Sequence, residues 1–161
     1  MKKIFALSAI ICILLCSCGT NNEPAEICVN RVFSAEMNIQ FNGTAYTADF
    51  TCKENGCNAV FSSPEEMLGL AVSTDGENFT YSLGDLEFTS SESDYQTQLI
   101  GAIYSAIVTL PVSASENEET YILQGASKYG NYIMYLNKEN CVPVFIEYED
   151  KDITVKFKDI T

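Results

Sequence analysis

Apolar and polar side chains alternate through most of the chain after residue 35. Met37, Ile39 and Phe41 are separated by polar residues, and Asn42-Gly43 then supplies the dipeptide typical of a two-residue hairpin turn. A repeat of two places successive apolar side chains on one face of an extended strand. We therefore expect consecutive antiparallel strands, each with one buried face, joined by short turns.

About nine or ten strands follow from this pattern. Ser63-Pro64-Glu65-Glu66 interrupts them with a short helical start, for which Ser63 is the expected cap. The later strands are defined by these apolar positions: Tyr46, Ala48, Phe50 and Cys52; Cys57, Ala59 and Phe61; Leu68, Leu70 and Val72; Phe79, Tyr81 and Leu83; Leu86 and Phe88; Tyr121 and Leu123; Tyr132, Met134 and Leu136; Val142, Val144, Ile146 and Tyr148; Ile153, Val155 and Phe157.

The period changes once, between residues 95 and 109. Apolar residues there recur every three or four positions, which predicts one amphipathic helix with a broad apolar stripe: Leu99, Ile100, Ile103, Tyr104, Ile107 and Val108. A single helix among many strands must bury its stripe against the sheet. The predicted fold is mainly β with one principal helix, as a curved antiparallel sheet, or unclosed half-barrel, wrapped around that helix.

The N-terminus has the features of an export signal. Lys2 and Lys3 precede an apolar run of signal-peptide length, which is too short to span a bilayer comfortably. The run ends at Leu15-Cys16-Ser17-Cys18, which resembles the lipobox of bacterial lipoproteins, with cleavage before Cys18. A plain secretory signal and an uncleaved anchor are the alternatives.

The lipobox resemblance implies three segments. Residues 1–17 would be the signal peptide, 18–27 the lipidated Cys18 with a polar tether, and 28–161 one domain. Acyl chains on Cys18 would hold the protein on the extracytoplasmic face of the cell membrane, because more than one hydrocarbon chain gives stable anchoring.

The net charge limits the classes of partner that the protein can bind. Cleavage removes Lys2 and Lys3 from the 9 basic side chains and leaves all 22 acidic ones, so the formal net charge moves from −13 to −15. A surface this acidic repels phosphate backbones. We expect no nucleic-acid partner, whereas a protein partner in the cell envelope stays open.

Four cysteines besides Cys18 remain in the exported part: Cys28, Cys52, Cys57 and Cys141. Exported chains meet oxidising conditions, so disulfides are expected, and four cysteines allow three connectivities. Cys52 and Cys57 flank a turn and share one face of facing strands, which favours a Cys52–Cys57 bridge and leaves Cys28–Cys141 as the second. A metal site is disfavoured because the chain has no His and the spacing is not that of a zinc knuckle.

The sequence over about residues 33–160 resembles the LolA-like superfamily, in particular its small Gram-positive membrane-anchored lipoproteins and the LppX type. The resemblance implies an unclosed antiparallel barrel around helices, with an apolar cavity that holds acyl chains in some members. The chain departs from the family in its four cysteines and its single long helix. The stretches that carry the resemblance are Tyr46–Phe50, Phe61–Leu70, Asp75-Gly76, Tyr121–Gly125, Gly130–Asn137, Val142-Pro143 and Ile153–Phe157.

Two hypotheses follow for the apolar interior. In one, the space between sheet and helix holds a lipid or another hydrophobic ligand; in the other, side chains fill it and the protein is an interaction or envelope sensor module. We expect no enzyme and no cofactor, because there is no His for a nucleophile system and the paired carboxylates lie at turns. The residues expected to line the cavity are Phe50, Phe61, Leu70, Tyr81, Leu99, Ile103, Ile107, Leu123, Met134 and Phe157.

Overall fold

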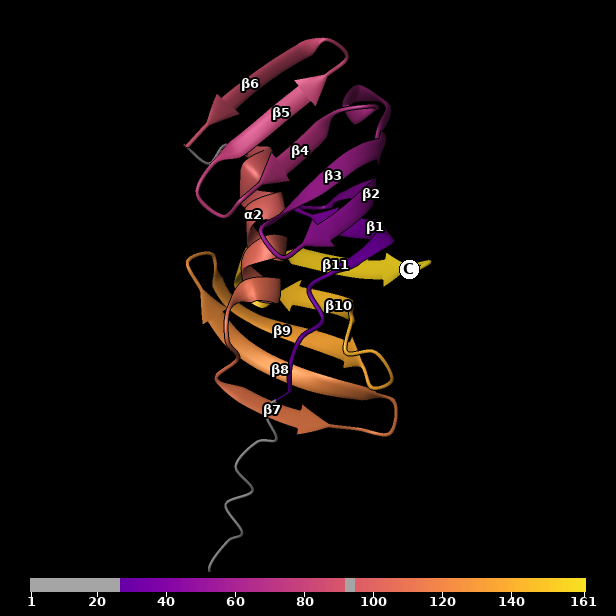
Figure 1. Ribbon diagram of the computed structural model, residues 1–161, viewed down its shortest axis with the longest axis vertical. Coiled ribbons are helices and arrows are strands. Elements are labelled where there is room, and N and C mark those ends of the chain that lie inside the picture. Colours follow the sequence, from indigo (N-terminus) through magenta and orange to yellow (C-terminus); the bar gives the residue numbers. More distant parts are fainter. Residues whose placement is uncertain (1–26, 92–94) are drawn as a thin grey trace, which may run out of the picture.

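The computed structural model describes residues 27–91 and 95–161, so the predicted signal peptide and Cys18 lie outside the described residues. The described part forms one antiparallel sheet with strand order β6-β5-β4-β3-β2-β1-β11-β10-β9-β8-β7, crossed by one α-helix, α2 (Figure 1). The bounds are β1 Phe33–Phe41, β2 Thr44–Lys53, β3 Gly56–Ser63, β4 Ala71–Thr74, β5 Phe79–Leu83, β6 Leu86–Ser90, α2 Tyr95–Val108, β7 Ser113–Glu116, β8 Thr120–Ser127, β9 Gly130–Asn137, β10 Pro143–Tyr148 and β11 Ile153–Lys158, with 3-10 turns at Glu65–Met67 and Glu149–Lys151.

The sheet consists of two meanders that meet at the first and last strands. β1 pairs with β2 on one side and with β11 on the other, so Met37 lies opposite both Ala48 and Phe157. β6 and β7 lie at the two ends of the sheet and do not pair with each other. The predicted unclosed antiparallel architecture is therefore confirmed.

The alternation in sequence is an alternation of burial in the structure. Along β1, Met37 and Ile39 are at most 1% exposed, while Asn38 between them is partly exposed. Asn42 and Gly43 both have positive φ, 48° and 76°, which is what a type I′ hairpin turn requires. One face of the sheet thus faces the helix, here called the inner face, and the opposite face is the outer face.

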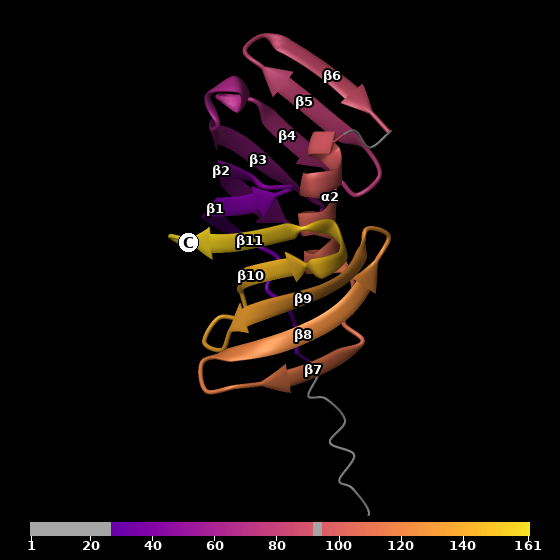
Figure 2. The same ribbon diagram turned by 180° about the vertical axis from the view of Figure 1, so that it is seen from behind.

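The helix runs across the strands and packs on the inner face against β3, β4, β8 and β10 (Figure 2). Its C-terminal carbonyls are satisfied from distant parts of the chain. Arg31 Nη2 donates to Val108 O at 3.0 Å, and Tyr132 Oη donates to Thr109 O at 3.0 Å. Tyr148 Oη donates to Ala102 O at 2.9 Å, and burial raises the pKa of Tyr148 to about 12, so this donor stays protonated.

The predicted helix over 95–109 is confirmed as Tyr95–Val108, whereas some strand details were wrong. The strand β7 was missed because Ser113–Glu116 carries only one apolar residue. Leu68 and Leu70 precede β4 instead of belonging to it, since Gly69 turns the chain with φ 80°. The short helical start is a 3-10 turn whose first position follows Pro64, and Ser63 ends β3 without capping it.

Among residues 27–91 and 95–161, no helix combines the length and the apolar character needed to cross a bilayer.

Candidate functional site

The residues predicted to line a cavity form the core. Nine of the ten are between 0% and 4% exposed, and Leu70 packs against them as a partly buried residue. Rings of Phe33, Phe50 and Phe157 contact one another with centroids 5.6–5.8 Å apart. None of the ten lines any of the four pockets described below, so side chains fill the part of the interior where a ligand was expected.

Two small pockets open at the rim between helix and sheet. Their volumes are about 360 Å³ and 230 Å³, and both are bordered by Phe79, Lys128 and Tyr129. Lys128 Nζ reaches across to Gly76 O at 3.3 Å and lies 5.2 Å from the Tyr129 ring centroid. These contacts of Lys128 narrow the openings of the two pockets. The volume of the smaller pocket is below the usual range for a small-molecule site.

The inner face has an exposed apolar end beyond the helix, formed by Leu83, Leu86 and Phe88 on β5 and β6. Phe88 stacks on buried Tyr81 with centroids 4.5 Å apart, and Leu83 lies opposite Leu86, so these three strand residues belong to the inner face. Figure 1 shows the β5–β6 hairpin extending past the first turn of α2. Their exposed fractions of 51–74% leave these side chains in contact with solvent.

The sequence pattern does not predict this exposed apolar end. Leu83, Leu86 and Phe88 are expected on strands with a buried face, because a period of two marks the inner face whether or not something covers it. The relevant signal is the length of the helix, since 14 residues reach only about 21 Å. Eleven strands at about 4.8 Å spacing form a much wider sheet, so part of the inner face had to stay uncovered.

A third pocket, of about 450 Å³, lies over β8 to β10 and carries three acidic side chains, Glu147, Glu149 and Asp150. Within the described residues no group of His, Cys, Asp or Glu is arranged to hold a metal ion. Glu149 and Asp150 start an exposed 3-10 turn, as the turn reading of this carboxylate pair predicted.

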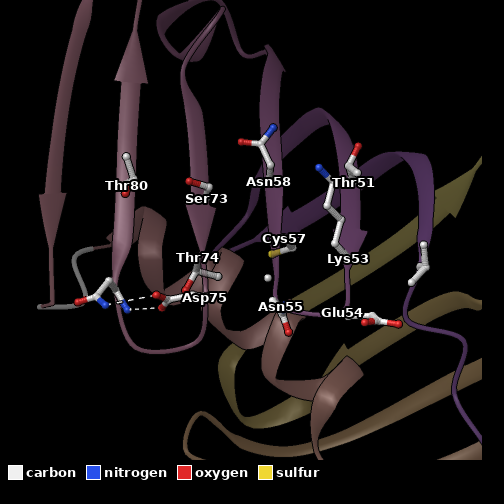
Figure 3. Close-up of a pocket in the computed structure, with 13 residues that line it drawn as sticks. Thr51, Lys53, Glu54, Asn55, Cys57, Asn58, Ser73, Thr74, Asp75 and Thr80 are labelled. Atoms are coloured by element: carbon white, nitrogen blue, oxygen red, sulfur yellow. Dashed lines mark hydrogen bonds between the residues drawn. The ribbon is translucent and has the colours of Figure 1, made fainter.

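The largest of the four pockets is a groove of about 900 Å³ on the outer face, at the ends of β2 to β5 (Figure 3). Hydroxyl and amide side chains point into it from the strands, and the turns at 53–56 and 75–78 border it. The alternation along the strands does not predict this groove, because it marks the buried positions and gives no information on the outer face.

The cysteine pair in the β2–β3 hairpin has the predicted placement. Cys52 and Cys57 lie directly opposite each other in the register and are 1% and 6% exposed. Burial raises the pKa of Cys52 to about 11, and burial followed by the neighbouring Cys52 raises the pKa of Cys57 well above its usual value. The structure holds all four cysteines as free thiols, so the two bridges stay predictions.

The second pair lies where the N-terminal segment meets the β9–β10 turn. Asn30 N donates to Cys141 O at 3.0 Å, which places the segment containing exposed Cys28 beside half-buried Cys141. This contact is compatible with the predicted Cys28–Cys141 bridge.

We expect peptide mapping of the full chain, isolated from cells without reductant, to recover Cys52 linked to Cys57. Trypsin cuts after Lys53, so the two cysteines fall on separate peptides that remain joined only through a disulfide. In protein that is reduced first, Cys28 should be alkylated well before Cys52 and Cys57, because buried protonated thiols are poor nucleophiles. Four free thiols in the exported protein would contradict the predicted bridges.

Comparison with known proteins finds solved structures of similar fold, but it assigns no activity. An uncharacterized conserved protein from Thermus thermophilus matches with a TM-score of 0.51 and 12% identity, over 80% of this chain and 77% of that chain. A LolA superfamily protein from Nitrosomonas europaea gives 0.49 and 11%, over 84% and 88%. MucB gives 0.47 and 12%, over 85% of this chain and 55% of its own.

No protein-family model matches the sequence, and no curated protein matches it significantly. At these identities the likeness to solved structures is one of fold alone. The chain has the architecture that its sequence pattern predicted, an unclosed antiparallel sheet curved around one helix. It shares this fold with the protein from Thermus thermophilus.

Proposed function

We propose that this chain is a membrane-tethered extracytoplasmic module that binds a lipid acyl chain or another apolar ligand, without catalysis, at the apolar end of its inner face. The observation that carries the proposal is the exposure of Leu83, Leu86 and Phe88 on the face that is otherwise the core. A ligand lying there would extend the core past the helix and remove these side chains from water.

The energetics favour a ligand of this class. Burial of apolar surface contributes about 25 cal/mol per Å², so covering one Leu or Phe side chain is worth about 1.5–3 kcal/mol. Phe88 is already held in place by its stacking on Tyr81, so little side-chain freedom is lost on binding. The tether on Cys18, predicted from the lipobox, would keep this end close to a lipid surface.

Native mass spectrometry of the full chain extracted from membranes tests the proposal. The spectra should show acyl mass on Cys18 and, in addition, a non-covalently held lipid. The change Phe88→Ser should lower the non-covalent occupancy about tenfold, since it removes an apolar contact worth more than about 1 kcal/mol.

Val112→Ser is the matched control, because Val112 is 81% exposed near β7, at the other end of the sheet. Its occupancy should equal that of the unmodified chain. Absence of bound lipid, or equal loss in both variants, would refute the apolar end as a lipid site.

A second candidate is a protein-interaction or envelope sensor module. It is favoured by the filled interior, in which Leu99, Ile103 and Ile107 are at most 2% exposed. A photo-reactive residue placed at position 88 distinguishes the two: recovery of one protein partner without lipid would support this candidate instead.

A further inference from the structure

Six uncharged polar side chains lie opposite one another across the outer face of β1 to β6, and we call them the polar row: Ser34, Thr51, Asn58, Ser73, Thr80 and Thr89. Each step across the row is one strand spacing, about 4.8 Å. The row therefore presents a hydrogen-bonding group at regular intervals over six strands.

The side chains in the middle of the polar row are free to form hydrogen bonds with a ligand. At its ends, Ser34 Oγ lies 3.2 Å from Thr51 Oγ1, and Thr80 Oγ1 lies 3.2 Å from Thr89 Oγ1. The side chains of Asn58 and Ser73, between these pairs, have no hydrogen-bond partner among the described residues, although their backbones pair within the sheet. An amide and a hydroxyl offer both donors and acceptors, so they suit a ligand that needs both.

The four central residues of the row line the 900 Å³ groove, so these side chains face a hollow in the surface (Figure 3). Its volume lies in the range of small-molecule and cofactor sites. The turn at 53–56 borders one part of the groove and the turn at 75–78 another, so the groove is bounded where the strands end.

The side chains of the groove disfavour phosphate-bearing ligands and alkyl chains. Among the described residues that line it, Lys53 is the one cation, against Glu54 and Asp75. Hydrogen bonds from the backbone N–H groups of Asn78 and Glu77 lower the pKa of Asp75, so this carboxylate stays ionised. A phosphate-bearing ligand would meet a net negative site, and an alkyl chain would strip water from amide and hydroxyl groups without replacing their hydrogen bonds.

We propose that the groove binds an uncharged oligosaccharide that lies across the strands along the polar row. A pyranose ring is about as long as one strand spacing, so successive rings bring hydroxyl groups to successive strands. Asn58 and Ser73 would contact the central rings, with Thr51 and Thr80 beside them. The site is on the opposite face from the apolar end and does not depend on it.

Isothermal titration of the full chain with cellohexaose and with the hexamer of N-acetylglucosamine tests the proposal. At least one of the two should bind, and Asn58→Ala and Thr80→Val should each raise its Kd about 5- to 10-fold, the loss expected for one or more hydrogen bonds. Thr154→Val is the matched control on the outer face of β11, outside the groove, and should leave the Kd unchanged.

Failure of both hexamers to bind would overturn the proposal, as would binding that all three variants leave unchanged. Tighter binding of an extended glycine-serine peptide than of either sugar would also overturn it. Phe88→Ser should leave sugar binding intact, so this test and the lipid test fail independently.

Discussion

Replacing Leu99 by Ala is expected to lower the free energy of unfolding by about 2–5 kcal/mol, the usual cost of a Leu→Ala change in a packed core. Leu99 is 2% exposed on the helix stripe that faces the sheet. The matched change Leu110→Ala, just past the end of the helix, removes a side chain that is 79% exposed and should cost no more than about 0.5 kcal/mol.

Urea unfolding followed by tyrosine circular dichroism measures both changes, because the chain has 9 Tyr and no Trp. The pair also tests the filled interior. If a ligand-sized space lay beside the helix stripe, Leu99 would have fewer packing partners and the two variants would unfold at similar urea concentrations.

Gly56→Ala should destabilise the protein by about 2–5 kcal/mol. Gly56 has φ 153°, which L side chains rarely adopt, and an added Cβ would overlap the backbone carbonyl oxygen of Thr74. A backbone carbonyl of the neighbouring strand cannot rotate away as a side chain would, so the β2–β3 turn would have to move.

The change Gly43→Ala separates the cost of the positive φ from the cost of the overlap with a neighbouring backbone atom. Gly43 also has positive φ, 76°, but an added Cβ would have no neighbour within 4 Å. Its cost should be only the backbone term, about 1–2 kcal/mol. Equal destabilisation of the two variants in thermal unfolding would show that the contact with Thr74 contributes nothing.

Much of the fold could be predicted because most strands have one buried face. Residues such as Met37 and Ile39 alternate in sequence because they alternate in burial, and the single change of period marked the helix to within one residue of its observed end. β7 could not be predicted in the same way. It lies at the edge of the sheet, and the pairing of its backbone with β8, instead of apolar side chains, holds Ser113–Glu116 in place.

The candidate sites were harder to predict than the fold. Both depend on which strands are neighbours, and alternation alone does not give that order. The exposed end at Leu86 and Phe88 follows from how far the helix reaches over the sheet, and the polar row follows from the registers that align Asn58 with Ser73. The hairpin cysteines were the exception, because one short turn fixes their positions relative to each other.

The position of β11 beside β1 has a consequence for biogenesis. The two meanders join through β11, the strand of this sheet that is synthesised last. The sheet therefore stays in two halves until β11 has left the ribosome. In the proposed export, the chain would cross the translocation channel unfolded, and this topology would delay completion of the native state until β11 has emerged. Removing β11 would therefore divide the sheet into two half-sheets that still share the helix but no longer pair strand to strand.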